Sequence, residues 1–391
     1  MFLELFKDKK VNIRRGIILI LGVAFFIFLY FFNQVDKAQL VNRQGTSFEK
    51  AVVEEVLNNA NIQGDGINAG KQIVKVRMLS GEYKGKVLEA TSFSGYLYGA
   101  ECRVNMKVII SLSKSGDDYV ASVYSYHREP IIYGFALAFI LILWLIGGKK
   151  GFKSALGLIF TFVCIIFLFI PMIYRGYSPF LSAVIIVILT TIVTMYLIAG
   201  FTTKSISSML GTIIGVIIAG LCAAGFGYFA KISGYNVAEI EELVFISNNT
   251  NMQIGGLLFA GILIASLGAV MDVAISIAST INEIYEQNKN LSRRELFNSG
   301  INVGRDMMGT MSNTLILAFT GGAINTLILS YSYSMKYNQI INMYSIGIEI
   351  MQGLSGSIAV ILTVPLVSII TSAMLTYKKV IREDIEKANT F

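Results

Sequence analysis

The chain has 391 residues, of which 54% are hydrophobic and only 15% are charged, and its net charge is +7. Soluble domains carry about 25% charged residues, so this chain lacks the groups needed to cover a surface in water. Its one histidine and three cysteines are too few for a common zinc or iron–sulfur site, and it has neither a GxxxxGK[ST] nor a GxSxG motif. We therefore expect no metal, no cofactor and no enzymatic activity.

Eight apolar runs of 17 or more residues predict membrane-spanning helices, because each can cross a hydrocarbon core about 30 Å thick. The first run follows a basic N-terminus and lacks the small residues of a cleavage site, so we expect an uncleaved anchor and not a signal peptide. The predicted fold class is a mainly α, polytopic membrane protein with about eight transmembrane helices. The runs are residues 16–33, 131–147, 155–174, 180–200, 206–230, 254–284, 307–331 and 347–377.

Basic residues set the predicted orientation, because lysine and arginine gather on the cytoplasmic side of membrane proteins. If the N-terminus is inside, the inner segments carry most of the basic residues that flank the spans. The short outer loops hold little more than Arg175, Lys231 and Lys336. We predict a multi-pass protein of the cell membrane with both termini in the cytoplasm.

Residues 34–130 form the one long polar region, which this orientation places outside the membrane. Its short alternating stretches, separated by glycine-rich turns, are typical of a small antiparallel β domain and favour a five-stranded, OB-like barrel. Outside the cell such a barrel would not meet nucleic acid, so we interpret it as a structural or substrate-gating module. The stretches are 71–79, 86–90, 102–112 and 118–126, and the predicted domains are 1–33, 34–130, 131–253 and 254–391.

One predicted span contains an acid, Asp272, in the middle of an apolar run. A carboxylate there costs about 3 kcal/mol and normally faces a bundle interior or water, so it predicts proton or ion handling. The alternative is a packing role, in which Asp272 only hydrogen-bonds a neighbouring helix. Helical periodicity places Asp272 within an arc of about 80° together with small residues, hydroxyls and a second acid. These are Gly261, Ala265, Gly268, Ser276, Ser279 and Glu283.

The following spans offer partners for this carboxylate. Thr310 and Thr314 share one face of the next span with Gly321 and Asn325, and Asn313 flanks that face. Arg305 could pair with Glu283, bind lipid phosphate or act as a basic anchor. Glu349 opens the last span, either as an outer acid of the same pathway or as a solvated side chain. Gly353 and Gly356 follow it and let helices approach closely or bend.

Between the predicted spans 254–284 and 307–331, Ser292 and Glu295 form a capping box that predicts the start of an amphipathic helix on the cytoplasmic membrane surface.

The helix that carries Gly268 and Asp272 and the Ser-Asn-Thr segment at 312–314 together resemble half of a SecD or SecF unit of the RND permease superfamily. That resemblance covers about 254–377. It implies coupling to the proton-motive force, with Asp272 as the protonated carboxylate.

Nearly the whole chain is similar to the YibE/F family of bacterial membrane proteins. The features that carry this resemblance are the VRMLSGEYKGK segment (76–86), the GRDMMGTMSNTLILAFTGG stretch (304–322) and the E-x-x-x-G-x-x-G-S pattern (349–357). The family has no well-established activity, so this resemblance by itself implies no function.

We predict a proton-coupled transporter or translocation-accessory protein that carries an unknown substrate across the lipid bilayer. The alternative is a membrane scaffold whose external β domain binds a protein partner. A homo-oligomer is compatible with either, and no nucleic acid is expected as a partner.

Overall fold

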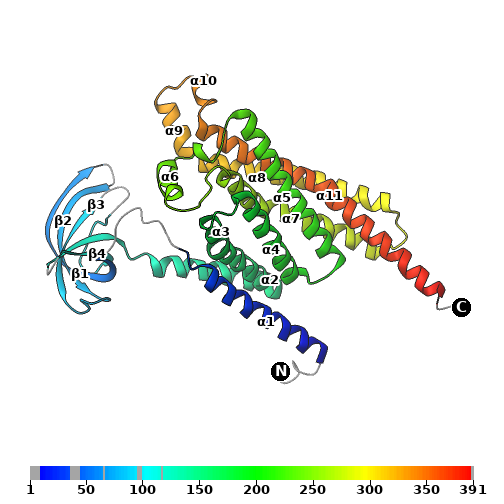
Figure 1. Cartoon of the computed structure of the whole chain (residues 1–391), viewed down its shortest axis with the longest axis horizontal. Coiled ribbons are helices and arrows are strands. Elements are labelled where there is room, and N and C mark those ends of the chain that lie inside the picture. The colour runs from blue at the N-terminus through cyan, green and yellow to red at the C-terminus, as the bar shows by residue number, and fades with distance from the viewer. Residues whose placement is uncertain (1–8, 36–44, 65–66, 95–98, 116–117, 389–391) are drawn as a thin grey trace. The chain divides into compact units, whose positions relative to one another are not determined.

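The computed structural model describes residues 9–35, 45–64, 67–94, 99–115 and 118–388 (Figure 1). The chain divides into two compact units. One comprises residues 39–146, and the other comprises residues 1–38 and 147–391. Part of the predicted basic N-terminus, including Lys7, and residues 36–44 of the predicted external region lie outside the described residues.

The smaller unit contains a closed five-stranded barrel with the strand order β1-β2-β3-β5-β4 (Figure 1). All neighbouring strands pair antiparallel except β3 and β5, which pair in parallel through Thr91 and Ser92. Alternate side chains fill the interior, among them Val53, Val76 and Ile110. The strands are β1 (Thr46–Gly64), β2 (Ile67–Met78), β3 (Val87–Ser94), β4 (Lys107–Ser115) and β5 (Asp118–Tyr126).

The five-stranded barrel confirms the predicted β domain, with two corrections. The longest strand, β1, is absent from the predicted stretches, and irregularities in its pairing between Val53 and Asn58 interrupt the alternation that would reveal it. Residues 102–106 were predicted as strand, but β4 begins only at Lys107. The preceding segment instead forms a turn in which Asn105 has a positive φ of 67°.

Helices make up the larger unit. Its long apolar helices are α2 (Glu129–Cys164), whose first turns lie in the smaller unit, α4 (Pro179–Ala199), α5 (Thr203–Ala230), α7 (Leu257–Gln287) and α11 (Tyr344–Ala388). Among the described residues, these five helices are long and apolar enough to cross a membrane, the first of them continuing to Tyr174. The remaining elements are α1 (Lys9–Phe32), η2 (Ile165–Phe169), α3 (Ile170–Tyr174), η3 (Gly234–Asn236), α6 (Ile240–Asn248), α8 (Arg293–Gly322), α9 (Ile324–Ser332) and α10 (Tyr337–Ile340).

Three features relate this number of helices to the eight predicted spans. The helices α8 and α9 give a sixth candidate span if they are taken together, although a bend of 56° separates them. The predicted spans 131–147 and 155–174 lie in the run from Glu129 to Tyr174, and the non-helical backbone of Gly148 (φ 55°, ψ −138°) divides this run into two helical segments at a kink. The apolar part of α1, Ile20–Phe32, is shorter than a full span. A membrane protein of several spans is thus supported, and the number eight stays a prediction.

The structure also corrects the predicted amphipathic surface helix. Ser292 and Glu295 do form the capping box, but α8 then runs without a break through the apolar residues to Gly322. No glycine-induced turn or proline separates the two parts, so the polar segment extends the span instead of forming a helix of its own.

The bundle packs around α7, which contacts α4, α5, α8 and α11. One face of α7 is fully buried, with Leu263, Val270 and Ile277 in the core. Glycines let the other helices approach it. A Cβ at Gly215 of α5 would overlap Thr363 and would lie 2.8 Å from Val270. Close contact through small residues is the usual way in which helices associate in lipid, where the hydrophobic effect gives no driving force.

Candidate functional site

Asp272 lies on the face of α7 that points away from the bundle core. The next residues, Val273 and Ala274, are fully buried, whereas the Asp272 side chain is exposed. Gly261, Ala265 and Gly268 share this exposed face, and a Cβ at either glycine would meet nothing within 4 Å. Of the two environments that the sequence left open for Asp272, a bundle interior or water, the structure shows no interior within this chain, because the small residues and the acid lie on its outer surface.

The rest of the predicted stripe continues toward the end of α7. Ser276 and Ser279 are half-buried, and Glu283 is exposed near the connection to α8. Within the described part of the chain, neither Asp272 nor Glu283 has a hydrogen bond or an ion pair. Arg305 forms no ion pair with Glu283 there either, so the structure does not bring this predicted pair together.

Polar side chains of α8 lie at the depth of Asp272. A Cβ at Gly300 would contact Ile281, which fixes the antiparallel alignment of α7 and α8. At about 1.5 Å per residue, Asp272 is then level with residues near Gly309. Thr310, Asn313 and Thr314 surround that level and are exposed, although the hydroxyls of both threonines donate to backbone carbonyls of their own helix. The exposed side of α7 and α8 is therefore polar near the middle of two apolar helices.

The bundle interior contains hydroxyl groups that the sequence analysis missed. They are fully buried on α4, α5 and α11, and one of them, Ser208, donates to the Ala274 carbonyl of α7 at 3.2 Å. The hydroxyls of Thr191, Thr212 and Thr371 have no partner among the described residues. Ser and Thr recur three and four residues apart in these apolar runs, at 205, 208 and 212 for example, and this helical spacing could have revealed them. A buried hydroxyl without a hydrogen bond is costly, so these positions favour buried water.

A second site surrounds Glu349. A cavity of about 320 Å³ lies between the last turns of α8, α9 and the start of α11. Its lining is apolar apart from Thr320 and Glu349, and the carboxylate has no hydrogen bond or ion pair within the described residues. Gly353 also lines this cavity, and Gly356 lies one turn further on, where α11 contacts Ser266 of α7 and Leu315 of α8. The other lining residues are Ile316, Phe319, Ala323, Leu327, Ile346, Ile350 and Leu354.

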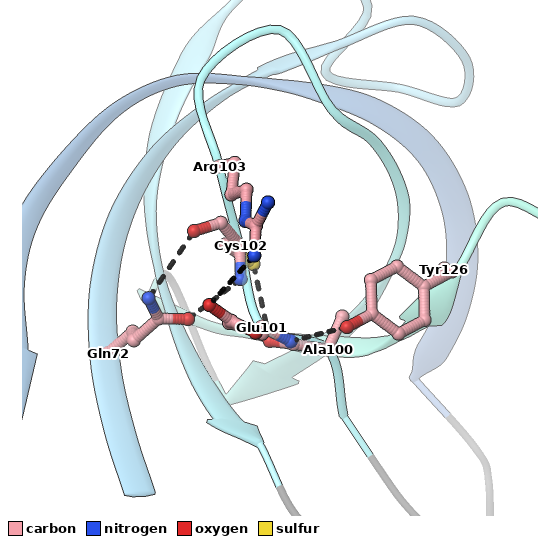
Figure 2. A network of polar contacts seen from close by, with 6 residues as sticks. All are labelled: Gln72, Ala100, Glu101, Cys102, Arg103 and Tyr126. Carbon is pink, nitrogen blue, oxygen red and sulfur yellow. Dashed lines mark hydrogen bonds and ion pairs between the residues drawn. The ribbon is translucent and has the colours of Figure 1, made fainter. Parts of the chain in front are cut away.

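The barrel holds a polar network that serves structure (Figure 2). The Gln72 amide donates to the Cys102 carbonyl at 3.3 Å and accepts from the Cys102 backbone N–H at 2.7 Å. The Tyr126 hydroxyl accepts from the Glu101 N–H at 2.9 Å. Burial raises the pKa of the Cys102 thiol, so this cysteine is poorly suited to act as a nucleophile. In the described ranges no group of three His, Cys, Asp or Glu side chains could hold a metal ion.

Aromatic side chains stand on the outside of the barrel. The rings of Phe48 and Tyr124 meet edge to face with centroids 5.0 Å apart. Phe93 is 61% exposed, with the Lys71 ammonium 5.9 Å from its ring centroid. Aromatic side chains are enriched where proteins bind other proteins.

The fold and these sites define a polytopic α-helical membrane protein with a five-stranded barrel and acids within its apolar helices. The YibE/F-like protein family matches residues 135–377, and the chain belongs to this family. The match covers more than half of the chain, includes Asp272 and Glu349, and excludes the barrel strands. No curated protein and no solved structure matches the chain, so the resemblance to SecD and SecF stays a prediction.

Proposed function

We propose that this protein is a membrane transporter coupled to the proton-motive force through Asp272. One observation carries the proposal. A single carboxylate lies mid-way along an apolar helix, without a partner in the described part of the chain and with a polar face of α8 at the same depth. An ionised acid costs about 3 kcal/mol at that depth, and protonation removes most of this cost. The protonation state can therefore favour one packing of α7 against its surroundings over another.

The mechanism requires Asp272 to exchange protons with both sides of the membrane in turn. On the side of the α7–α8 connection, the proton path runs from Glu283 past Ser279 and Ser276 to Asp272. The proton can pass along hydroxyl groups or water. Release on the other side would follow the exposed face past Thr314. The proposed orientation, with eight spans in the cell membrane and both termini in the cytoplasm, places the α7–α8 connection inside.

Proton flux into proteoliposomes tests this proposal. Under an imposed pH gradient, we expect the wild type to conduct protons and Asp272→Asn to lose most of this flux, because an amide cannot be deprotonated. Glu286→Gln is the control on the same helix, since Glu286 is exposed beyond the apolar stretch and pairs with Lys289 at 3.6 Å. Equal flux through the wild type and Asp272→Asn would exclude a proton-carrying role for this acid.

A scaffold is the second candidate, because of the exposed aromatic rings on the barrel. The strand order with parallel β3 and β5 supports an OB-type barrel, a fold that binds ligands on its sheet surface. In this case Phe93→Ala would abolish the cellular phenotype of the protein, whereas Asp272→Asn would be tolerated. The opposite pattern would favour the transporter.

A further inference from the structure

The cavity beside Glu349 has the size and composition of a small-ligand site. Its volume of about 320 Å³ is within the range of ligand pockets, which are mostly apolar with a few polar groups that fix orientation. Phe319, Leu327, Ile350 and Leu354 supply apolar wall. A pathway for protons alone would not need such a wall, so the cavity suits an organic molecule.

Electrostatics select the charge of that molecule. Glu349 is a carboxylate without a hydrogen bond or ion pair within the described residues, and no lysine, arginine or histidine lines the cavity. The C-terminal end of α8 and the N-terminal ends of α9 and α11 all meet at this cavity, so their opposed dipoles favour neither sign and the Glu349 charge sets the potential. The Phe319 ring can also present its negative face to a cation. Anions and anionic lipid headgroups are therefore disfavoured.

We propose that this cavity binds an organic monocation with an apolar body, such as a quaternary ammonium compound. Its charged end lies against Glu349, and its apolar part contacts the wall formed by α8, α9 and α11. As the substrate class of the transporter, this ligand rests on the proposed function. Binding itself requires neither transport nor Asp272.

Two compounds of the same shape test the proposal on the full-length protein in detergent. Benzyltrimethylammonium carries the charge, and neopentylbenzene has a carbon in place of its nitrogen. We expect the ammonium to bind at least about tenfold more tightly, because a desolvated cation gains from both the carboxylate and the ring. In Glu349→Gln the difference disappears, and in the control Glu242→Gln, an exposed acid on α6 outside the cavity, it remains.

A cavity-filling variant covers the case in which Glu349→Gln folds poorly. Leu354→Trp places an indole in the cavity from a half-exposed position, so it lowers the affinity for both compounds while the thermal midpoint stays close to that of the wild type. Equal binding of the two compounds, or unchanged ammonium binding by Glu349→Gln, would overturn the proposal. A co-purifying phospholipid that the ammonium does not displace would identify the site as a lipid site instead.

The two proposals fail separately. Binding is measured without a pH gradient. If Asp272→Asn loses proton flux but the wild type does not bind the ammonium, only the proposed ligand is refuted. Ammonium binding that depends on Glu349, together with wild-type proton flux in Asp272→Asn, refutes only the coupling.

Discussion

At the scale of single residues, Gln72 shows how one side chain fixes an irregular segment. Its amide satisfies both backbone groups of Cys102 in the barrel interior, where neither would find water. Asp272 shows the opposite arrangement, since its side chain has no partner in the described part of the chain. Gln72 therefore stabilises the fold through its hydrogen bonds, whereas Asp272 forms no such stabilising contact among the described residues.

Gln72→Ala should therefore destabilise the barrel by about 2 kcal/mol, because it leaves a buried N–H and a buried carbonyl without partners. The measurement is pulse proteolysis of the full-length chain in detergent, with the exposed neighbour Lys75→Ala as the control. Labelling of the Cys102 thiol gives a second readout. Burial raises its pKa, so at pH 8 the native chain labels more slowly than free cysteine, and Gln72→Ala labels faster than the native chain. An unchanged labelling rate would show that the network does not hold this segment.

At the scale of elements, glycines determine how closely the helices pack. The two glycines Gly215 and Gly225 lie on the same helix, α5, but in different surroundings. A Cβ at Gly215 would overlap Thr363 of α11, whereas a Cβ at Gly225 would meet nothing within 4 Å. The contact between α5 and α11 therefore depends on the first glycine and not on the second.

Alanine at these two positions should have opposite effects. Gly215→Ala forces α5 away from α11 and α7 and costs about 1–3 kcal/mol. Gly225→Ala is neutral or stabilises by up to about 1 kcal/mol, because alanine favours a helix more than glycine does. Thermal midpoints of the two variants in the same detergent measure the difference. Equal midpoints would mean that the helices are not in close contact at Gly215.

At the scale of the whole molecule, orientation is the property that the proposed proton path depends on. Asn290 lies in the connection between α7 and α8, and Asn338 lies in α10 at the other end of α8 and α9, so a membrane would separate them. In a chain without its native cysteines, an impermeant maleimide should label Asn338→Cys on intact cells. Asn290→Cys should react only after the cells are opened. The reverse result would place both termini outside.

Much of this architecture could be predicted from the sequence, because apolar runs and strand alternation are local signals. The starts of α4 and α5, the barrel and the capping box at Ser292 follow from such signals. The strand β1 was missed because its irregular pairing interrupts the alternation. The direction of Asp272 could not be predicted, because periodicity shows which residues share a face but not which face the other helices cover. The cavity at Glu349 lies where α8, α9 and α11 fold back on one another between Ile316 and Leu354, and no periodic pattern in the sequence encodes these bends.

The open surroundings of Gly261 and Gly268 have a consequence for natural variation. Folding of this chain alone places no steric limit on a larger residue at either position, since an added carbon would touch nothing within 4 Å. A library of random substitutions can be selected for function in cells. Depletion of larger residues at these two positions would then show that another protein molecule packs against this face of α7. Free variation there would show that only lipid touches this side of α7. The record of tolerated mutations thus reports on neighbours that are not encoded in the chain itself.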